Sequence, residues 1–451
     1  MEFILEEDSV INDDLILSNS LSISINEEQA GGSSRLSVIF LIINAALGAG
    51  LLNFPQAFDQ AGGVLTALSV QAVLLAWIMG SLIILAYCAD QASARTLQDV
   101  LEWSCGRTGL WVGSVCITVY CLGTCVTFLV IIGDQFDRVL SSQHGSDFCY
   151  YWYMNRGFTI TASSTLLILP LCYSRRIDFL KYASSLGVVE VLCVVALIVY
   201  EKYYGGFVPG PVKSAPDHWT DMFLVIPVIC FGYQCHVSVI PIYACLKGRS
   251  LRNFTLCTSC AIGLCAVVYT LAGAFGYLTF GSLVTSDILE SYDKSSPLVL
   301  MGVVSIAVKT ITTYPILLFC GREAVSQLWC SFFHTLSADV ALQERSRRVV
   351  ITSACFALTL ALAVVSPDIG SVIDMLGSLA AVFIFVFPGV CLLLSTLRKD
   401  PHILLNKDKF MVVVSAFLIL FGTFIFGLVF VQAAERFASQ TKHVNELCFR
   451  A

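Results

Sequence analysis

The interpretation of this chain begins with the stretch Asn44-Ala45-Ala46-Leu47-Gly48-Ala49-Gly50-Leu51-Leu52-Asn53-Phe54-Pro55. It lies in an apolar run that is long enough to enter a bilayer, yet it contains two glycines, two asparagines and a proline. Glycine weakens a helix interior, and proline removes a backbone donor. In lipid, freed backbone groups are tolerated only where protein or a water-filled cavity satisfies them. The stretch therefore predicts a broken membrane helix that binds something polar. A packing kink with small-residue contacts is the alternative.

Composition places the whole chain in a membrane. Of its 451 residues, 57% are hydrophobic and only 13% are charged, and the mean hydropathy is +0.80. These values are typical of a polytopic membrane protein and exclude a soluble one. Much of the acidic charge lies in the first 28 residues, so the net charge of −6 says little about partners. The lipid bilayer is the expected surrounding, and we expect no nucleic-acid partner.

A helix needs about 20 apolar residues to cross the hydrocarbon, and eleven runs qualify. They lie at 36–58, 64–88, 109–133, 158–174, 181–202, 219–243, 254–280, 297–320, 349–366, 371–396 and 410–432. The sequence thus predicts an all-α polytopic membrane protein with eleven transmembrane helices. Its predicted parts are a disordered acidic cytosolic arm (1–34), a core of ten helices (35–396), a connecting loop with the eleventh helix (397–432) and a short extracytosolic tail (433–451).

Orientation follows from the distribution of lysine and arginine. These residues predominate in the loops on the side of the N-terminus, and such loops usually face the cytosol. We therefore expect the N-terminus in the cytosol and the C-terminus outside. The glycosylation pattern Asn253-Phe254-Thr255 falls on the inner side, so it should stay unmodified.

A second interruption occurs in the sixth run. Pro227 and Pro241 flank Cys230-Phe231-Gly232-Tyr233-Gln234-Cys235-His236. The first and sixth runs are five apart and enter from opposite faces. Broken helices at matching positions in two halves are typical of inverted repeats with a binding site near the membrane midplane. This pattern predicts a 5+5 inverted-repeat (LeuT-like) core in which helices 1 and 6 are broken.

Several motifs in their order and spacing together resemble one family. Besides the stretch 44–55 they are Ala61-Gly62-Gly63, Ile132-Gly133-Asp134-Gln135, Phe231-Gly232-Tyr233-Gln234-Cys235-His236, Tyr277-Leu278-Thr279-Phe280-Gly281 and Phe383-Ile384-Phe385-Val386-Phe387-Pro388-Gly389. From about residue 35 to 432 the chain resembles the sodium-coupled neutral amino acid transporters. This is solute carrier family 38 of the amino acid/auxin permease group, and the resemblance is greatest to its seventh and eighth members. It implies import of glutamine-like neutral amino acids, coupled to sodium.

The residues also predict where such a substrate would bind. Backbone amides at the start of a half-helix suit a carboxylate, because the aligned peptide dipoles favour an anion there. The break at Gly48, Ala49 and Gly50 provides such amides. Freed carbonyls near Phe231 and Gly232 suit the ammonium group, and Phe231 would close over the substrate. Ordinary packing is an equally good interpretation of Phe231.

Sodium requires hard oxygen ligands, which unwound carbonyls and half-helix ends supply in such transporters. The resemblance implies an asparagine of the first span and a threonine of the eighth, which correspond here to Asn44 and to Thr313 or Thr312. Hydroxyls bonded to their own helix are the alternative for the threonines. Beyond sodium we expect no cofactor.

Two charges stand in mid-membrane, Glu190 in the fifth run and Lys309 in the eighth. An intramembrane charge costs several kcal/mol (about 2.5–3.5 for lysine), so it should be paired or functional. We expect an ion pair between them; two separate polar residues facing cavities are the alternative. An ammonium near Thr313 would also suit the place of sodium, which would make transport sodium-independent or proton-linked.

Other functions fit less well. An amino acid sensor, or transceptor, that signals through the acidic arm would keep the same fold. A channel is disfavoured because paired breaks suit an enclosed site. An enzyme is disfavoured because the sequence has no HExxH, no GxSxG and no paired catalytic carboxylates. For the location of this multi-pass protein we expect the plasma membrane, with the lysosomal membrane as the alternative.

Overall fold

The computed structural model describes residues 33–144, 151–173, 180–293, 296–333, 344–366, 369–398 and 406–440. In these ranges the chain is built from helices, and the single β-bridge joins Ser33 to Leu246. The elements, in chain order, are α2 (Arg35–Ala46), η1 (Ala49–Asn53), α3 (Phe54–Gln60), α4 (Val64–Gln91), α5 (Leu97–Cys105), α6 (Arg107–His144), η3 (Trp152–Met154), α7 (Arg156–Ser163), η4 (Ser164–Ile168), α8 (Leu169–Cys172), α9 (Leu180–Tyr204), η5 (Trp219–Val225), α10 (Ile226–Gly232), α11 (His236–Ala244), α12 (Leu251–Phe280), η6 (Gly281–Leu283), α13 (Ile288–Ser291), α14 (Pro297–Phe333), α16 (Glu344–Val365), α17 (Ile369–Ala381), η7 (Val382–Val386), α18 (Phe387–Leu397) and α19 (Asn406–Gln440). The predicted all-α class is confirmed.

Within the described ranges, eight helices are long and apolar enough to cross a membrane, and nine if the bent pair made by α2 and η1–α3 forms one span. The shorter apolar helix Arg156–Cys172 occupies the place of the fourth predicted run, and α9 occupies the place of the fifth. The total of eleven spans stays a prediction.

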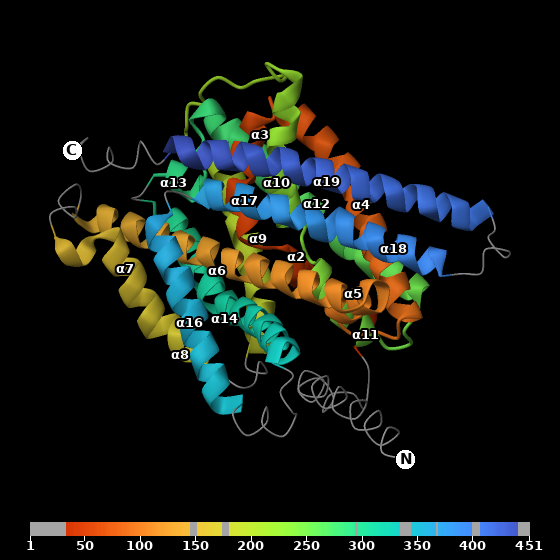
Figure 1. Ribbon diagram of the computed structural model, residues 1–451. Helices are drawn as coiled ribbons and strands as arrows, with labels where there is room; N and C mark the ends of the chain where they lie inside the picture. Colours follow the sequence, from red (N-terminus) through yellow and green to blue (C-terminus); the bar gives the residue numbers. More distant parts are fainter. Residues whose placement is uncertain are drawn as a thin grey trace, which may run out of the picture.

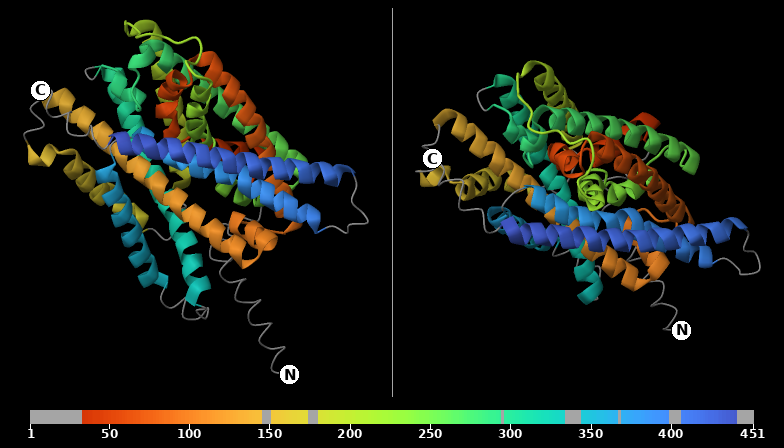
Figure 2. Two further views of the ribbon diagram at one scale, coloured as in Figure 1. Left: turned by 45° about the horizontal axis from the view of Figure 1, so that its top comes forward. Right: turned by 90° about the horizontal axis from the view of Figure 1, so that it is seen from above.

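The interrupted helices lie at the centre of the molecule (Figure 1). In the most apolar stretch of the span that contains α10 and α11, 78% is buried, whereas in the corresponding stretch of α19 only 28% is buried. The helix α12 packs against α2, α3, α4 and α9, whereas α19 lies along α17 and α18 at the periphery. Figure 2 shows the same arrangement of the helices from two further directions. The breaks themselves are thus buried among neighbouring helices, whereas α2 leaves Leu36, Phe40 and Leu41 exposed on one side.

Two wide helical turns precede prolines. The π-helical segments η4 and η7 are followed by α8 and α18, each with a proline in its first turn. Proline cannot donate a backbone hydrogen bond, so the regular pattern of helical hydrogen bonds changes at this point. A π-helical turn accommodates this change. Because η7 contains Phe383, this turn sets the position of an aromatic side chain near the helix breaks.

The described structure differs from the predicted boundaries at the end of the N-terminal arm and at the end of the last helix. Ser33 was expected in the disordered arm, yet its amide donates to Cys245 O at 2.8 Å, and its carbonyl accepts from Lys247 N at 3.0 Å. Ser34 caps α2 through its hydroxyl, so folded structure begins before residue 35. The rest of the arm, 1–32, lies outside the described residues. The last helix continues to Gln440, beyond the predicted end at 432, and the tail 441–451 is outside the described residues.

Candidate functional site

The first predicted break is present in the membrane helix formed by α2, η1 and α3. The α-helix ends at Ala46, Leu47 forms its C-cap, and Gly48 is extended. A 3₁₀ segment then begins at Ala49 and leads into α3, whose axis is bent by 52° from that of α2. The interruption leaves the last carbonyls of α2 and the first amides of η1 without partners in a continuous helix.

The second predicted break is also present. The helix α10 ends at Gly232, and α11 begins at His236. The side-chain oxygen of Gln234 accepts a hydrogen bond from the His236 amide at 3.1 Å. The imidazole of His236 is fully buried, and its Nε2 lies 2.8 Å from Ser81 Oγ on α4. The second break is therefore stabilised by its own side chain and by one neighbouring helix.

The two breaks face each other. A Cβ added at Gly50 would lie 3.2 Å from Phe231 Cδ1 and 3.3 Å from Gly232 Cα. A Cβ added at Gly232 would lie 3.0 Å from Phe54 Cε2. By contrast, a Cβ at Gly48 would meet no described atom within 4 Å. The structure thus brings the predicted substrate residues of both breaks together and leaves free space beside Gly48.

Tyr269 of α12 joins the two breaks, and sequence reasoning missed it. Its hydroxyl lies 2.7 Å from Ala46 O and 2.9 Å from Gly232 O, and it accepts from the Gly48 amide at 3.2 Å. Its ring stacks on Phe54 with the centroids 4.3 Å apart. A buried tyrosine hydroxyl needs a hydrogen-bond partner, so a tyrosine in the middle of an apolar run was the available signal.

Aromatic side chains from other helices line the same region. The Tyr120 ring on α6 lies 6.3 Å from the Phe231 ring and 5.5 Å from the Phe383 ring of η7. All three side chains are buried. Together they form an apolar wall beside the polar backbone of the breaks, which is the combination typical of a small-molecule site.

Of the residues predicted to bind sodium, Asn44 lies near the end of α2, and Thr312 and Thr313 lie on α14. A Cβ added at Gly187 of α9 would lie 3.5 Å from Asn44 Oδ1 and 3.8 Å from Lys309 Cγ. The Lys309 ammonium donates to Leu47 O at 2.6 Å and to Gly187 O at 3.4 Å. The first, fifth and eighth predicted spans therefore meet at the carbonyl end of the first half-helix.

The two threonine candidates differ. Thr312 Oγ1 lies 2.9 Å from both Val308 O and Lys309 O, so its hydroxyl is bonded to its own helix. Thr313 lies one turn beyond Lys309 on the same face of α14. In the part of the chain that the structure describes, its hydroxyl has no hydrogen-bond partner. Thr313 is therefore the better candidate of the two for an ion ligand.

The expected ion pair between Glu190 and Lys309 is not formed. No nitrogen–oxygen contact within 4 Å joins them in the described ranges, although their charges interact through space. Glu190 is only 7% exposed, and its Oε2 has no hydrogen-bond partner. The correction has a physical reason: the Lys309 ammonium has two main-chain oxygens within reach, one of them at the negative end of a helix dipole.

The segment that follows the first break is connected to the segment before α13. Asn53 Nδ2 donates to Ser286 O at 3.0 Å. The next residue, Asp287, accepts from Gln135 Nε2 at 2.8 Å and from the Leu289 amide at 2.9 Å. Burial raises the pKa of the Asp287 carboxyl from 3.8 to about 7. Gln135, which closes the third predicted span, is thus part of an outer polar cluster.

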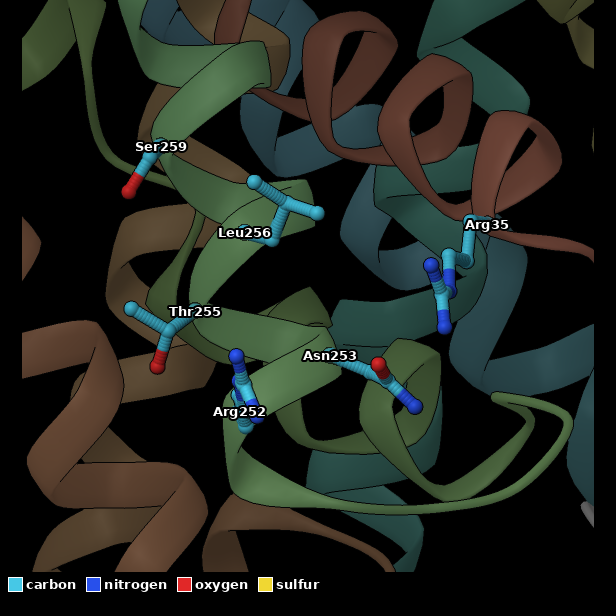
Figure 3. A pocket seen from close by; sticks show the side chains of 6 residues that line it. All are labelled: Arg35, Arg252, Asn253, Thr255, Leu256 and Ser259. Carbon is cyan, nitrogen blue, oxygen red and sulfur yellow. The ribbon is translucent and has the colours of Figure 1, made fainter.

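A cavity of about 710 Å³ lies away from the breaks. Its lining residues are Arg35, Arg252, Asn253, Thr255, Leu256 and Ser259. Figure 3 shows Arg35 at the start of α2 and the other five on the first turns of α12. None of the predicted substrate or sodium residues lines it, so we do not assign it to the transport site. It places two arginines predicted to be cytosolic at one end of the molecule.

The enclosed pair of helix breaks defines the class of protein. The fold is similar to that of MhsT, in a crystal structure of that protein in complex with L-phenylalanine, with a TM-score of 0.57 and 15% identity. The similarity covers 89% of this chain and 99% of that one. The predicted LeuT-like fold is confirmed, and the chain has the architecture of a broken-helix membrane transporter.

The family follows from sequence comparison. Residues 31–433 match the family described as "Transmembrane amino acid transporter protein". Sodium-coupled neutral amino acid transporter 7 of Danio rerio is 40% identical over 90% of this chain and 88% of its own. The protein of that name from Homo sapiens is 39% identical over 88% and 87%, and solute carrier family 38 member 8 of Mus musculus is 36% identical over 87% and 92%. This chain belongs to the transmembrane amino acid transporter family. It is an amino acid transporter of the sodium-coupled neutral amino acid type. The predicted resemblance and the prediction that the protein is not an enzyme are both confirmed.

Proposed function

We propose that this protein imports glutamine-like neutral amino acids by alternating access, and that an inward sodium gradient drives the import. The observation that carries the proposal is the contact between the two helix breaks. Gly50 of the first break lies against Phe231 and Gly232 of the second, so that an added Cβ would be only 3.2 Å from Phe231 Cδ1. A zwitterion bound there would meet amides from one break and carbonyls from both.

The substrate carboxylate is proposed to bind at the start of η1. The amides of Ala49 and Gly50 open this segment, and the first amides of a helix have no partner inside it. Their dipoles favour a negative charge. The free space beside Gly48 offers room for the carboxylate and the α-carbon.

The substrate ammonium is proposed to bind near Gly232. The carbonyls of Ala46 and Gly232 both face the Tyr269 hydroxyl, so they converge on one point between the breaks. Phe231 would cover the substrate from the side of Tyr120. A neutral side chain fits this site best, because the neighbouring aromatic wall carries no charge to pair with a charged one.

Sodium is proposed to bind at the other face of the first break. The Asn44 side-chain oxygen, the last carbonyls of α2 and the Thr313 hydroxyl are the proposed ligands, with Thr312 as the second choice on α14. Substrate and ion would then contact the same interruption from two sides. This arrangement couples them, because each ligand favours the conformation of the break that the other needs.

Alternating access is proposed to arise from movement of the half-helices around a fixed site. In inverted-repeat carriers, one bundle rocks against the other while the midplane site is retained. For the location we propose the plasma membrane, with the lysosomal membrane as the alternative and a cytosolic N-terminus in both cases. A glycan on Asn253 would contradict this orientation.

The test is uptake of labelled glutamine into proteoliposomes that contain the purified full-length protein. An inward sodium gradient is compared with equimolar choline at two pH values. We expect uptake only with sodium, and we expect Asn44→Ala and Thr313→Ala each to raise the half-maximal sodium concentration about tenfold or more, as loss of one ligand to a charged group predicts.

Two further variants separate the candidates. Thr312→Ala should raise the half-maximal sodium concentration less than Thr313→Ala, because the Thr312 hydroxyl is already bonded to its own helix. Thr310→Ala on the same helix is the control, since the Thr310 hydroxyl donates to Ile306 O at 2.7 Å. Glutamine uptake that is equally fast in choline would contradict the sodium coupling. Absence of uptake despite measurable glutamine binding would contradict the transport itself.

A further inference from the structure

The carbonyl end of α2 accepts a hydrogen bond from a lysine of another helix. Lys309 is 4% exposed, and its Nζ lies 2.6 Å from Leu47 O. Leu47 is the C-cap of α2, so its carbonyl is at the negative end of the helix dipole and has no amide partner in the helix. A charge-assisted hydrogen bond of this length is a strong contact in a buried place. The chain therefore supplies its own cation to the end of α2.

The ammonium lies among the proposed sodium ligands. Its second acceptor is Gly187 O at 3.4 Å, and a Cβ at Gly187 would lie 3.5 Å from Asn44 Oδ1. Thr313, whose hydroxyl has no hydrogen-bond partner among the described residues, is one helical turn from Lys309. Sodium and an ammonium carry the same charge and seek the same carbonyl oxygens. Two such cations a few ångströms apart repel each other strongly in a poorly polarisable interior, so this group of oxygens holds one of them at a time.

Glu190 provides a second position for the lysine. It is buried on α9, its Oε2 has no hydrogen-bond partner, and it lies one turn from Gly187, whose carbonyl the ammonium already contacts. A buried carboxylate without a partner is costly. The lysine stem is flexible and has four carbons, so a small rotation moves the ammonium from the Leu47 carbonyl toward this carboxylate.

We propose that Lys309 is a tethered cation that competes with sodium for the carbonyl end of α2, and that sodium binding displaces its ammonium to Glu190. The inference rests on the proposed sodium-coupled function and deepens it. Without sodium, the ammonium satisfies the carbonyls of the break. With sodium, the lysine neutralises Glu190 instead. The site holds a positive charge in both states, which lets the sodium-free carrier return without exposing bare carbonyls.

The test compares the sodium dependence of glutamine uptake in four proteins in proteoliposomes: the natural chain, Lys309→Met, Glu190→Gln and the double variant. Lys309→Met removes the competitor and should lower the half-maximal sodium concentration about tenfold or more. Glu190→Gln removes the second position and should raise that concentration several-fold. The double variant should behave like Lys309→Met, because without the ammonium the carboxylate no longer affects the competition.

Lys202→Met is the matched control. Lys202 Nζ also donates to a main-chain carbonyl, that of Leu278, at 2.6 Å, but at the opposite end of α9 from the break. This variant should keep the half-maximal sodium concentration of the natural chain. An unchanged or higher value in Lys309→Met would overturn the inference, as would additive effects of the two substitutions in the double variant.

A second readout separates this inference from the proposed function. Sodium-dependent thermal stabilisation of the purified proteins, measured without amino acid, should appear at lower sodium concentration in Lys309→Met than in the natural chain. This holds even if glutamine is not the substrate. If the natural chain ignores sodium and Lys309→Met responds to it, displacement of the lysine by sodium is rejected together with sodium coupling of the natural chain. If neither protein responds to sodium, the inference is rejected.

Discussion

The two helix breaks are stabilised in different ways. At the first break, the end of α2 is held by side chains from distant parts of the chain, namely the Lys309 ammonium and the Tyr269 hydroxyl. At the second break, Gln234 of the break itself accepts from the His236 amide, and Ser81 of the neighbouring helix α4 contacts the His236 ring. The first break therefore depends on groups that other ligands could replace. The second break also has contacts from other helices, through Ser81, Gln71 and Tyr269, but it has in addition a hydrogen bond of its own, from the His236 amide to Gln234.

This difference suggests a division of roles. Caps that come from other helices are lost when those helices move or when an ion takes their place, so the first break is suited to respond to ligands. A cap within the break moves with it and preserves its shape. Tyr269 is the exception, because it contacts the carbonyl ends of both broken helices. A substitution of Tyr269 therefore tests the difference between the two breaks most directly.

The largest effect is expected from Tyr269→Phe. The substitution keeps the stacking on Phe54 but removes the hydroxyl shared by Ala46, Gly48 and Gly232. Each buried polar group left without a partner costs about 1–3 kcal/mol, so glutamine uptake should fall at least tenfold. Uptake into proteoliposomes at equal protein content measures this.

Tyr277→Phe is the control for that prediction. Tyr277 lies on the same helix, and its hydroxyl accepts from the Lys213 amide at 2.8 Å rather than bonding to the main chain of a break. Its loss should change uptake less than twofold. Equal losses in both variants would mean that α12 as a whole is sensitive, and the special role of Tyr269 at the breaks would be wrong.

A smaller effect, confined to the second break, is expected from Ser81→Ala. The His236 ring would lose its contact at 2.8 Å in a fully buried place, which should destabilise the protein by about 1 kcal/mol. The half-maximal sodium concentration should stay unchanged, because none of the proposed sodium ligands belongs to the second break. Thermal unfolding together with sodium titration of uptake tests both statements.

Ser415→Ala provides the comparison for Ser81→Ala. Ser415 is equally buried, and its hydroxyl, like that of Ser81, donates to a carbonyl of its own helix. Among the described residues it has no hydrogen bond to another helix like that between Ser81 and His236. It should therefore change the unfolding temperature less. A shift in the sodium dependence of Ser81→Ala would show that the second break also senses the ion, and the proposed division between the breaks would fail.

The sequence predicted the breaks and the meeting of three spans well, because glycines, prolines and asparagines in apolar runs are local signals. The side chains of Asn44 and Lys309 lie near Gly187 because the fold brings the first, fifth and eighth spans together. The sequence did not predict that Lys309 would bond to Leu47 O rather than to Glu190. A flexible side chain with several acceptors in reach makes a choice that depends on distances of a few ångströms, which periodicity does not contain.

The contribution of Tyr269 was missed for a related reason. A tyrosine in an apolar run signals only that its hydroxyl needs some partner. The partners here are more than 200 residues away at the first break and 37 residues away at the second. Helix lengths were underestimated as well: α14 reaches Phe333 and α19 reaches Gln440. Polar residues extend a helix beyond the apolar segment that hydropathy detects.

The smallest predicted effect concerns pH and the outer support of the first break. Burial, reinforced by the nearby charge of Glu290 and opposed by Arg138, raises the pKa of Asp287 to about 7 from the ordinary 3.8. Between these values the native state retains a proton that the unfolded chain has lost. Stability contributed by this group therefore decreases as the pH rises through this range and is level above about 7.

Asp287→Asn tests this prediction. The amide oxygen can still accept from Gln135 or from the Leu289 amide, but the side chain no longer titrates. The unfolding temperature of the natural protein should decrease as the pH rises from about 5 to about 7. The decrease of the unfolding temperature with pH should be smaller in the variant. Because Asn53 at the end of η1 connects the segment after the first break to Ser286, next to Asp287, the same variant should reduce any pH dependence of the half-maximal sodium concentration. An identical slope in both proteins would show that Asp287 does not titrate in this range, and the first break would then be independent of the outer polar cluster.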